Sequence, residues 1–148
     1  EAFLNHGIVM RKVGKLDHAT KSFKRAVEIL PNYPEAHNKL GITLIDLNQY
    51  EDAIKHFEFA VSYKYDFAEA HNNLGVANRE LGQINNAVKH FEKAIEINPI
   101  YTLCLLNLGT SLKDLGQKDE AIKCFEKAIA IEPDNFKAQQ NLKELSAN

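Results

Sequence analysis

Apolar and polar positions alternate along the chain with the period of an α-helix. Between positions 84 and 97, apolar residues recur at helical spacing, as in Ala87, Val88, Phe91, Ala94 and Ile95. The charged and amide residues between them fall largely on the opposite face. The pattern therefore predicts an amphipathic helix here, and similar patterns recur along the chain.

This pattern returns at a fixed interval of 34 residues. The phrase "EAHNKLG" at 35–41 comes back as "EAHNNLG" at 69–75, and several columns of like residues follow the same interval without an insertion. Small residues let two helices approach closely, and a phenylalanine can fill the hollow between them, with roughly 1.5–3 kcal/mol gained per buried ring. The columns are Gly7, Gly41, Gly75 and Gly109; Ala19, Ala53, Ala87 and Ala121; Phe23, Phe57, Phe91 and Phe125; and Ala26, Ala60, Ala94 and Ala128.

Turn residues divide each unit into two helices. Gly14, Gly82 and Gly116 share one column with Asn48, and they predict a turn between a first and a second helix. Prolines at 31, 99 and 133 predict the end of the second helix. Each unit is therefore expected to be a helical hairpin.

These columns resemble the tetratricopeptide repeat family. The resemblance implies an all-α, right-handed superhelical solenoid with four repeats and a C-terminal capping helix. The repeats are expected at 1–33 (its first residue missing), 34–67, 68–101 and 102–135, with the capping helix at 136–148. Tyr65 stands where the other units carry proline, so the second and third units are expected to join through a more continuous or more mobile helix end.

Composition excludes several classes of protein. The formal net charge is −2, and the 18 basic and 20 acidic residues are interspersed, so no basic stripe for nucleic acid is predicted. No apolar run approaches the roughly 18 residues needed to cross a membrane. Cys104 and Cys124 do not form a disulfide framework in a chain of this size, which favours a reducing, cytoplasmic location.

The residues also predict neither a catalytic nor a cofactor site. All seven glycines fall in the two structural columns, so none remains for a phosphate-binding loop. His37 and His71 share one column and His56 and His90 another, and equivalent positions on successive units lie too far apart to hold one metal ion. We expect His37 and His71 to pack in the helix pair with one nitrogen satisfied. The chain is predicted to bind no metal and no cofactor and not to be an enzyme.

A column of asparagines is not explained by packing. Asparagine is a poor residue inside a helix because its amide competes with the backbone. The resemblance places this column in the concave groove, as in the superhelical array of O-linked N-acetylglucosamine transferase and similar bacterial proteins, where groove asparagines hold the backbone of an extended peptide. The alternative is that these asparagines bond to one another or to solvent. The column is Asn5, Lys39, Asn73, Asn107 and Asn141, and Asn38, Asn72, Arg79 and Lys113 are expected beside it as further peptide-binding residues.

Two functions follow from this interpretation. The first is a protein-interaction module that binds an extended segment of a partner protein in the groove. The second is a structural module of a larger protein that self-associates into a dimer or filament through its N-terminal edge or its convex surface. Phe3, Leu4, Ile8 and Val9 leave the first helix apolar on one side, whereas the last helix has a polar outer face.

Overall fold

The computed structural model describes residues 1–147 and contains nine α-helices and no β-strand in that range. The all-α prediction is confirmed. The helices are α1 (Ala2–Lys12), α2 (Leu16–Ile29), α3 (Pro34–Asp46), α4 (Tyr50–Tyr63), α5 (Ala68–Glu80), α6 (Ile84–Ile97), α7 (Thr102–Asp114), α8 (Lys118–Ile131) and α9 (Phe136–Ser146). None of them is long and apolar enough to span a membrane.

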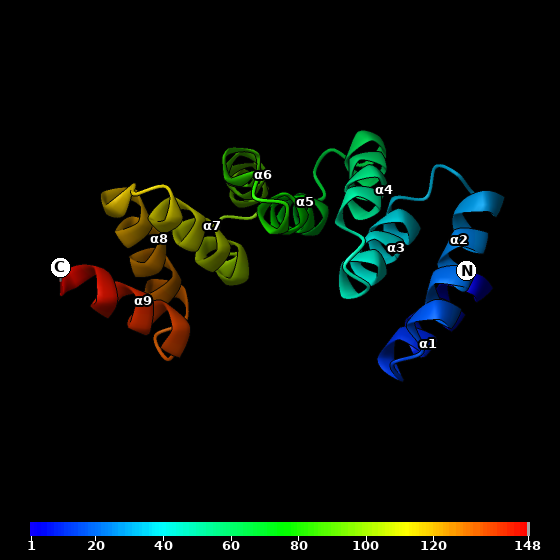
Figure 1. The fold of residues 1–148 in the computed structure, drawn as a ribbon, viewed down its shortest axis with the longest axis horizontal. Helices are drawn as coiled ribbons and strands as arrows, with labels where there is room; N and C mark the ends of the chain where they lie inside the picture. Colours follow the sequence, from blue (N-terminus) through cyan, green and yellow to red (C-terminus); the bar gives the residue numbers. More distant parts are fainter. Residues whose placement is uncertain (148) are drawn as a thin grey trace.

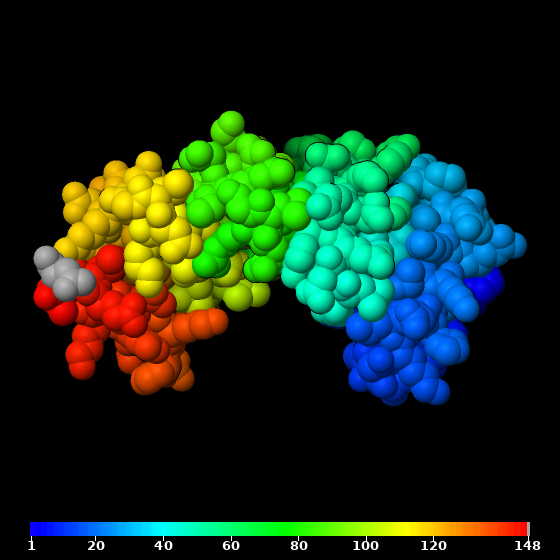
Figure 2. All heavy atoms as spheres, viewed as in Figure 1, coloured from blue at the N-terminus to red at the C-terminus, as the bar shows by residue number. Residues whose placement is uncertain are grey.

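The helices stack in chain order into an open arch. Each helix packs against the next one along the chain, and each odd-numbered helix also touches the next odd-numbered helix. Figure 1 shows the termini at opposite ends of the long axis, with α3, α5 and α7 toward the inside of the arch and α4, α6 and α8 toward the outside. Figure 2 shows the molecule hollowed along its lower edge, between the N-terminal and C-terminal ends. Contacts restricted to near neighbours make this a helical solenoid.

The core is a line of phenylalanines that face glycines. Phe23, Phe57, Phe91 and Phe125 are completely buried, as the sequence predicted. A Cβ atom added at Gly7, Gly41, Gly75 or Gly109 would lie 2.4–2.7 Å from the Cε1 atom of the facing ring. Only glycine therefore allows the first helix of each pair to approach the ring of the second helix this closely.

The turn between the two helices of a pair is a Schellman motif. At the end of α1, the N–H of Gly14 donates to the carbonyl of Arg11 at 3.0 Å, and the N–H of Lys15 donates to that of Met10 at 2.9 Å. The motif needs a left-handed residue at the glycine position, and Gly14 has φ +76°. Asn48 takes the same role after α3 with φ 59°. Asparagine tolerates this region better than most side chains, which explains its place in a glycine column.

The junction at Tyr65 contradicts the prediction of a more continuous helix end, while a more mobile end stays a prediction. Helix α4 ends at Tyr63 and α5 begins at Ala68, so α4 has the same 14-residue length as α2, α6 and α8. The helix is not more continuous in the absence of proline. The carbonyl of Tyr65 accepts a hydrogen bond from His71 Nε2 at 3.3 Å, and the equivalent carbonyl of Pro31 accepts one from His37 Nε2 at 2.8 Å. The same bond therefore forms with or without proline at this position.

Candidate functional site

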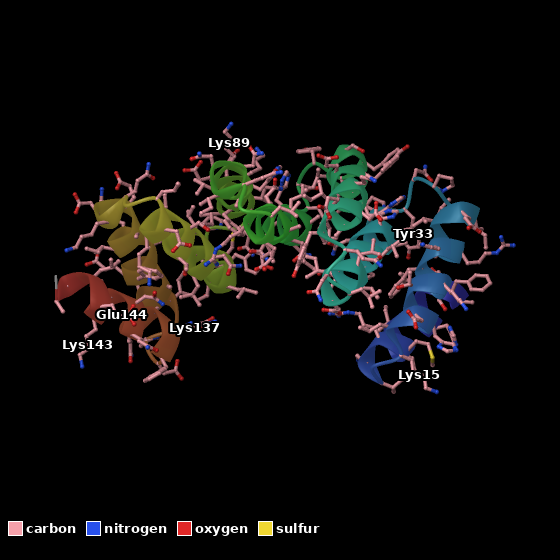
Figure 3. All side chains as sticks on the ribbon, viewed as in Figure 1. Lys15, Tyr33, Lys89, Lys137, Lys143 and Glu144 are labelled. Carbon is pink, nitrogen blue, oxygen red and sulfur yellow. The ribbon has the colours of Figure 1, made fainter. Side chains whose placement is uncertain are left out.

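The asparagine column runs along the inner face, by which we mean the surface of the odd-numbered helices that lines the hollow. Its members lie one to each odd-numbered helix, and all except the exposed Asn5 are half-buried. In Figure 3, Lys137 projects from α9 toward the hollow. Asn141 lies one turn further along α9, on the same side of the helix. Because the column repeats in register, Asn107 and Asn73 occupy the same position on α7 and α5.

Two carboxamides of the column are held by asparagines of the preceding unit. Asn73 Nδ2 donates to Asn38 Oδ1 at 3.0 Å, and Asn107 Nδ2 donates to Asn72 Oδ1 at 3.0 Å. Asn38 is 0% and Asn72 2% exposed. These two residues, which the sequence placed in the groove, therefore lie beneath its surface and act as acceptors. The orientation of Asn73 and Asn107 is fixed by bonds between consecutive odd-numbered helices.

Each held carboxamide keeps hydrogen-bonding capacity for a ligand. A primary amide carries two donor hydrogens and one acceptor oxygen. Among the described residues, Asn73 and Asn107 each use one amide hydrogen, which is donated to the asparagine of the preceding unit. One N–H and the carbonyl oxygen remain, which match the C=O and the N–H of an extended peptide backbone.

The two ends of the column are arranged differently. Lys39 Nζ donates to Glu69 Oε1 at 3.1 Å, and Asn141 Oδ1 accepts from Lys113 Nζ at 2.7 Å. The bonded asparagines of the middle units are 35 residues apart, and the corresponding partners of Lys39 and Asn141 would be Leu4 and Leu106. A leucine side chain cannot accept a hydrogen bond. The bonds between asparagines of successive units are therefore confined to the places where both residues are amides.

Ion pairs link successive units at the edge of the inner face. Arg11 Nε lies 2.7 Å from Asp46 Oδ2, and Arg79 Nη2 lies 3.3 Å from Asp114 Oδ2. Lys113 Nζ lies 3.4 Å from Glu144 Oε2 in addition to its bond to Asn141. Arg79 and Lys113, both predicted groove residues, are thus already engaged, so a ligand would compete with carboxylates for them.

Four of the six histidines form two pairs, each within one unit. His37 Nε2 lies 2.8 Å from the carbonyl of Pro31 and must donate to it, so neutral His37 offers Nδ1 as an acceptor to His56 Nδ1–H, 3.0 Å away. Both nitrogens of His37 are therefore bonded, whereas the sequence predicted one. The rings of His71 and His90 lie 5.8 Å apart, and buried His71 Nδ1 has no partner among the described residues. The pairs join positions 19 residues apart, a spacing outside the 34-residue repeat.

These pairs predict a loss of stability in mild acid. Burial, reinforced by the charge of neighbouring His37, lowers the pKa of His56 from 6.5 to about 4, and burial also lowers the pKa of His71 and His90. As the pH falls, these histidines become protonated at a higher pH in the unfolded chain than in the folded chain. Their contribution to the free energy of unfolding is therefore complete above about pH 6.5 and declines as the pH falls toward 4. Urea unfolding across this range should show the decline.

A matched variant isolates the first histidine pair. The fourth unit carries Leu105 and Cys124 at the equivalent positions, so the His37→Leu, His56→Cys double variant introduces a combination that this fold already holds. Its unfolding free energy should fall less steeply than that of the parent between pH 6.5 and 4. An unchanged slope would contradict the assignment.

The described residues offer neither a metal site nor a reactive thiol. Within residues 1–147, no group of three or more His, Cys, Asp or Glu side chains is placed to hold a metal ion. Burial raises the pKa of the Cys104 thiol to about 12 and also raises that of Cys124, so both stay protonated at neutral pH. The expectation of no metal, no cofactor and no catalysis remains a prediction.

Comparisons with known proteins agree on the repeat. The Tetratricopeptide repeat family model matches residues 68–101 and 103–135, and the TPR repeat model matches 7–45 and 43–80. A search of curated proteins finds no match. These models together cover most of the chain, which confirms the repeat that the sequence columns indicated.

Solved structures share the whole fold. The crystal structure of MamA is similar with a TM-score of 0.89 and 30% identity, over 95% of this chain and 82% of that one. TTC0263, a thermophilic TPR protein of Thermus thermophilus, gives a TM-score of 0.78 and 25% identity over 99% and 80% of the two chains. YrrB, described as a TPR protein with an unusual peptide-binding site, gives 0.83 and 23% identity over 98% and 75%, a likeness of fold alone.

Proposed function

Since the chain belongs to the tetratricopeptide repeat family, whose fold serves as a protein-interaction module, we propose that its inner face binds an extended segment of a partner protein. The observation that carries this proposal is the pair of held carboxamides, Asn73 and Asn107. Each has one donor and one acceptor left for a peptide backbone. Contacts to backbone atoms are insensitive to side-chain identity, so specificity must come from neighbouring groove residues.

The contributions of the site residues differ along the groove. Asn73 and Asn107 contact the ligand, while buried Asn38 and Asn72 hold them in place. Asn5, Lys39 and Asn141 are outlying positions, and Arg79 and Lys113 lie at the edge. Each backbone bond contributes roughly 0.5–1.5 kcal/mol net, so a few such bonds minus ordering costs give weak, micromolar or poorer, binding.

The test is an Asn73→Ala, Asn107→Ala double variant. A random peptide library is selected on the parent, and a selected peptide is synthesised and titrated by fluorescence anisotropy. We expect the variant to bind at least about tenfold more weakly, or ~1.4 kcal/mol, because two backbone contacts are lost. Its helical circular dichroism should be unchanged.

The control is an Asn85→Ala, Asn86→Ala double variant. It removes the same two amides from exposed positions on α6, a helix on the outside of the arch. It should bind the peptide as the parent does. Equal binding by all three proteins would exclude the groove as the site.

Self-association is a second candidate, favoured by the N-terminal edge. Phe3 is 43% and Val9 52% exposed. The equivalent residues of α3, which packs against α2, are buried: His37 is 5% and Thr43 0% exposed. A pocket of about 430 Å³ opens beside Phe3 at the end of α2. Light scattering over a range of concentrations separates the two functions, because a chain that stays monomeric throughout does not self-associate through this edge.

A further inference from the structure

The first and second units each depart from the repeat at one groove position, and both departures add positive charge. Lys12 ends α1 where the other units carry an acidic residue, and Lys39 stands on α3 where the later odd-numbered helices carry asparagine. The acidic residues are Asp46, Glu80 and Asp114, and the asparagines are Asn73, Asn107 and Asn141. Neither lysine is required by packing, since the other units fold without one at that position.

These two lysines line one pocket. The pocket lies between α1, α2 and α3, has a volume of about 190 Å³, and is lined by Ile8, Arg11, Lys12, Phe23 and Lys39. At about 30 Å³ per water molecule, that is room for about six waters or for one side chain. Two of its lining residues are apolar and three are cations, and no carboxylate lines it.

The charges around this pocket do not cancel. Arg11 is paired with Asp46 and Lys39 with Glu69, which leaves Lys12 in no ion pair within residues 1–147. At the equivalent place between α5 and α7, Glu80 replaces the lysine at the helix end and Asn107 replaces Lys39. The place between α1 and α3 is therefore more cationic than the equivalent place between α5 and α7.

We propose that this pocket binds an aspartate or glutamate side chain of the partner segment, so that the groove selects peptides that are acidic at the end nearest α1. The carboxylate lies between Lys12 and Lys39, and the methylene groups pack against Ile8. This inference rests on the proposed function, since the held asparagines bind the same segment. Their backbone contacts supply affinity, and the pocket supplies sequence preference.

The experiment compares the parent with a Lys12→Glu, Lys39→Asn variant in selections from the same random peptide library. Both substitutions introduce residues that other units already carry, so folding should be retained. The control is a Lys89→Glu, Lys123→Asn variant, which changes the net charge equally at exposed positions of α6 and α8. Figure 3 shows Lys89 on the outer edge of the arch.

Peptides selected on the parent and on the control should share an acidic residue at one position, and those selected on the pocket variant should lack it. Replacing that residue by its amide should weaken binding to the parent about fivefold, and binding to the pocket variant hardly at all.

Two failures are distinguishable. Selected peptides with no acidic preference, whose binding still requires Asn73 and Asn107, overturn this inference and leave the groove function intact. An absence of any enriched peptide, or binding that survives the Asn73→Ala, Asn107→Ala change, overturns both.

Discussion

Replacing Phe91 with alanine should lower the free energy of unfolding by about 3–5 kcal/mol, which is the usual cost of removing a buried aromatic ring. The ring is 0% exposed, lies against Gly75 of the partner helix, and belongs to the third of the four helix pairs. The cavity left behind would lie between helices that each pack against their neighbours, so it could close only by moving them.

Urea or thermal unfolding followed by circular dichroism measures this loss. Lys89→Ala on the same helix is the control, since Lys89 is exposed and projects from the outer edge of the arch (Figure 3). If the two variants were equally stable, the assignment of the phenylalanine column to the core would be wrong.

Replacing Gly75 with alanine should destabilise the chain by about 1–3 kcal/mol, the range found for overpacked cores. The direction of the change in unfolding free energy is informative, because in an exposed helix the same substitution stabilises by about 1 kcal/mol. A Cβ atom at this position would lie 2.4 Å from Phe91 Cε1. The helix pair would have to separate or the ring would have to leave its rotamer.

A double-mutant cycle tests the cause of this effect. In the Phe91→Ala background the obstructing ring is absent, so Gly75→Ala should become neutral or stabilising. The four unfolding free energies give the coupling directly. Additive effects of the two changes would show that the contact between glycine and phenylalanine does not determine how closely the two helices approach.

This close packing also prepares the inner face for binding. The bonds from Asn73 to Asn38 and from Asn107 to Asn72 each join one odd-numbered helix to the next odd-numbered helix. They form in successive units with the same length because the glycine and phenylalanine columns hold each hairpin in the same geometry. A repeating core thus gives a repeating line of donors and acceptors, which suits the repeating backbone of an extended segment.

The sequence alone determined the helices, their pairing and the core. Four copies of the glycine, alanine and phenylalanine columns at one interval leave few alternatives, because each helical face must be buried against another helix. Turn chemistry was equally local, since Gly14 and Asn48 end their helices through bonds to residues within one turn. Such features depend on neighbours in the chain, and a sequence displays these directly.

Only the tertiary structure decided which side chains meet between units. Equivalent residues recur every 34 positions, yet the bonded asparagines and the arginine–aspartate pairs are 35 apart. The histidine pairs and the basic pocket at α1 likewise join residues from different helices. The reason is physical: the rotation and offset of one helix relative to the next follow from the packing of many side chains at once. A column of identical residues establishes that positions are equivalent, and the packed arrangement establishes which of them touch.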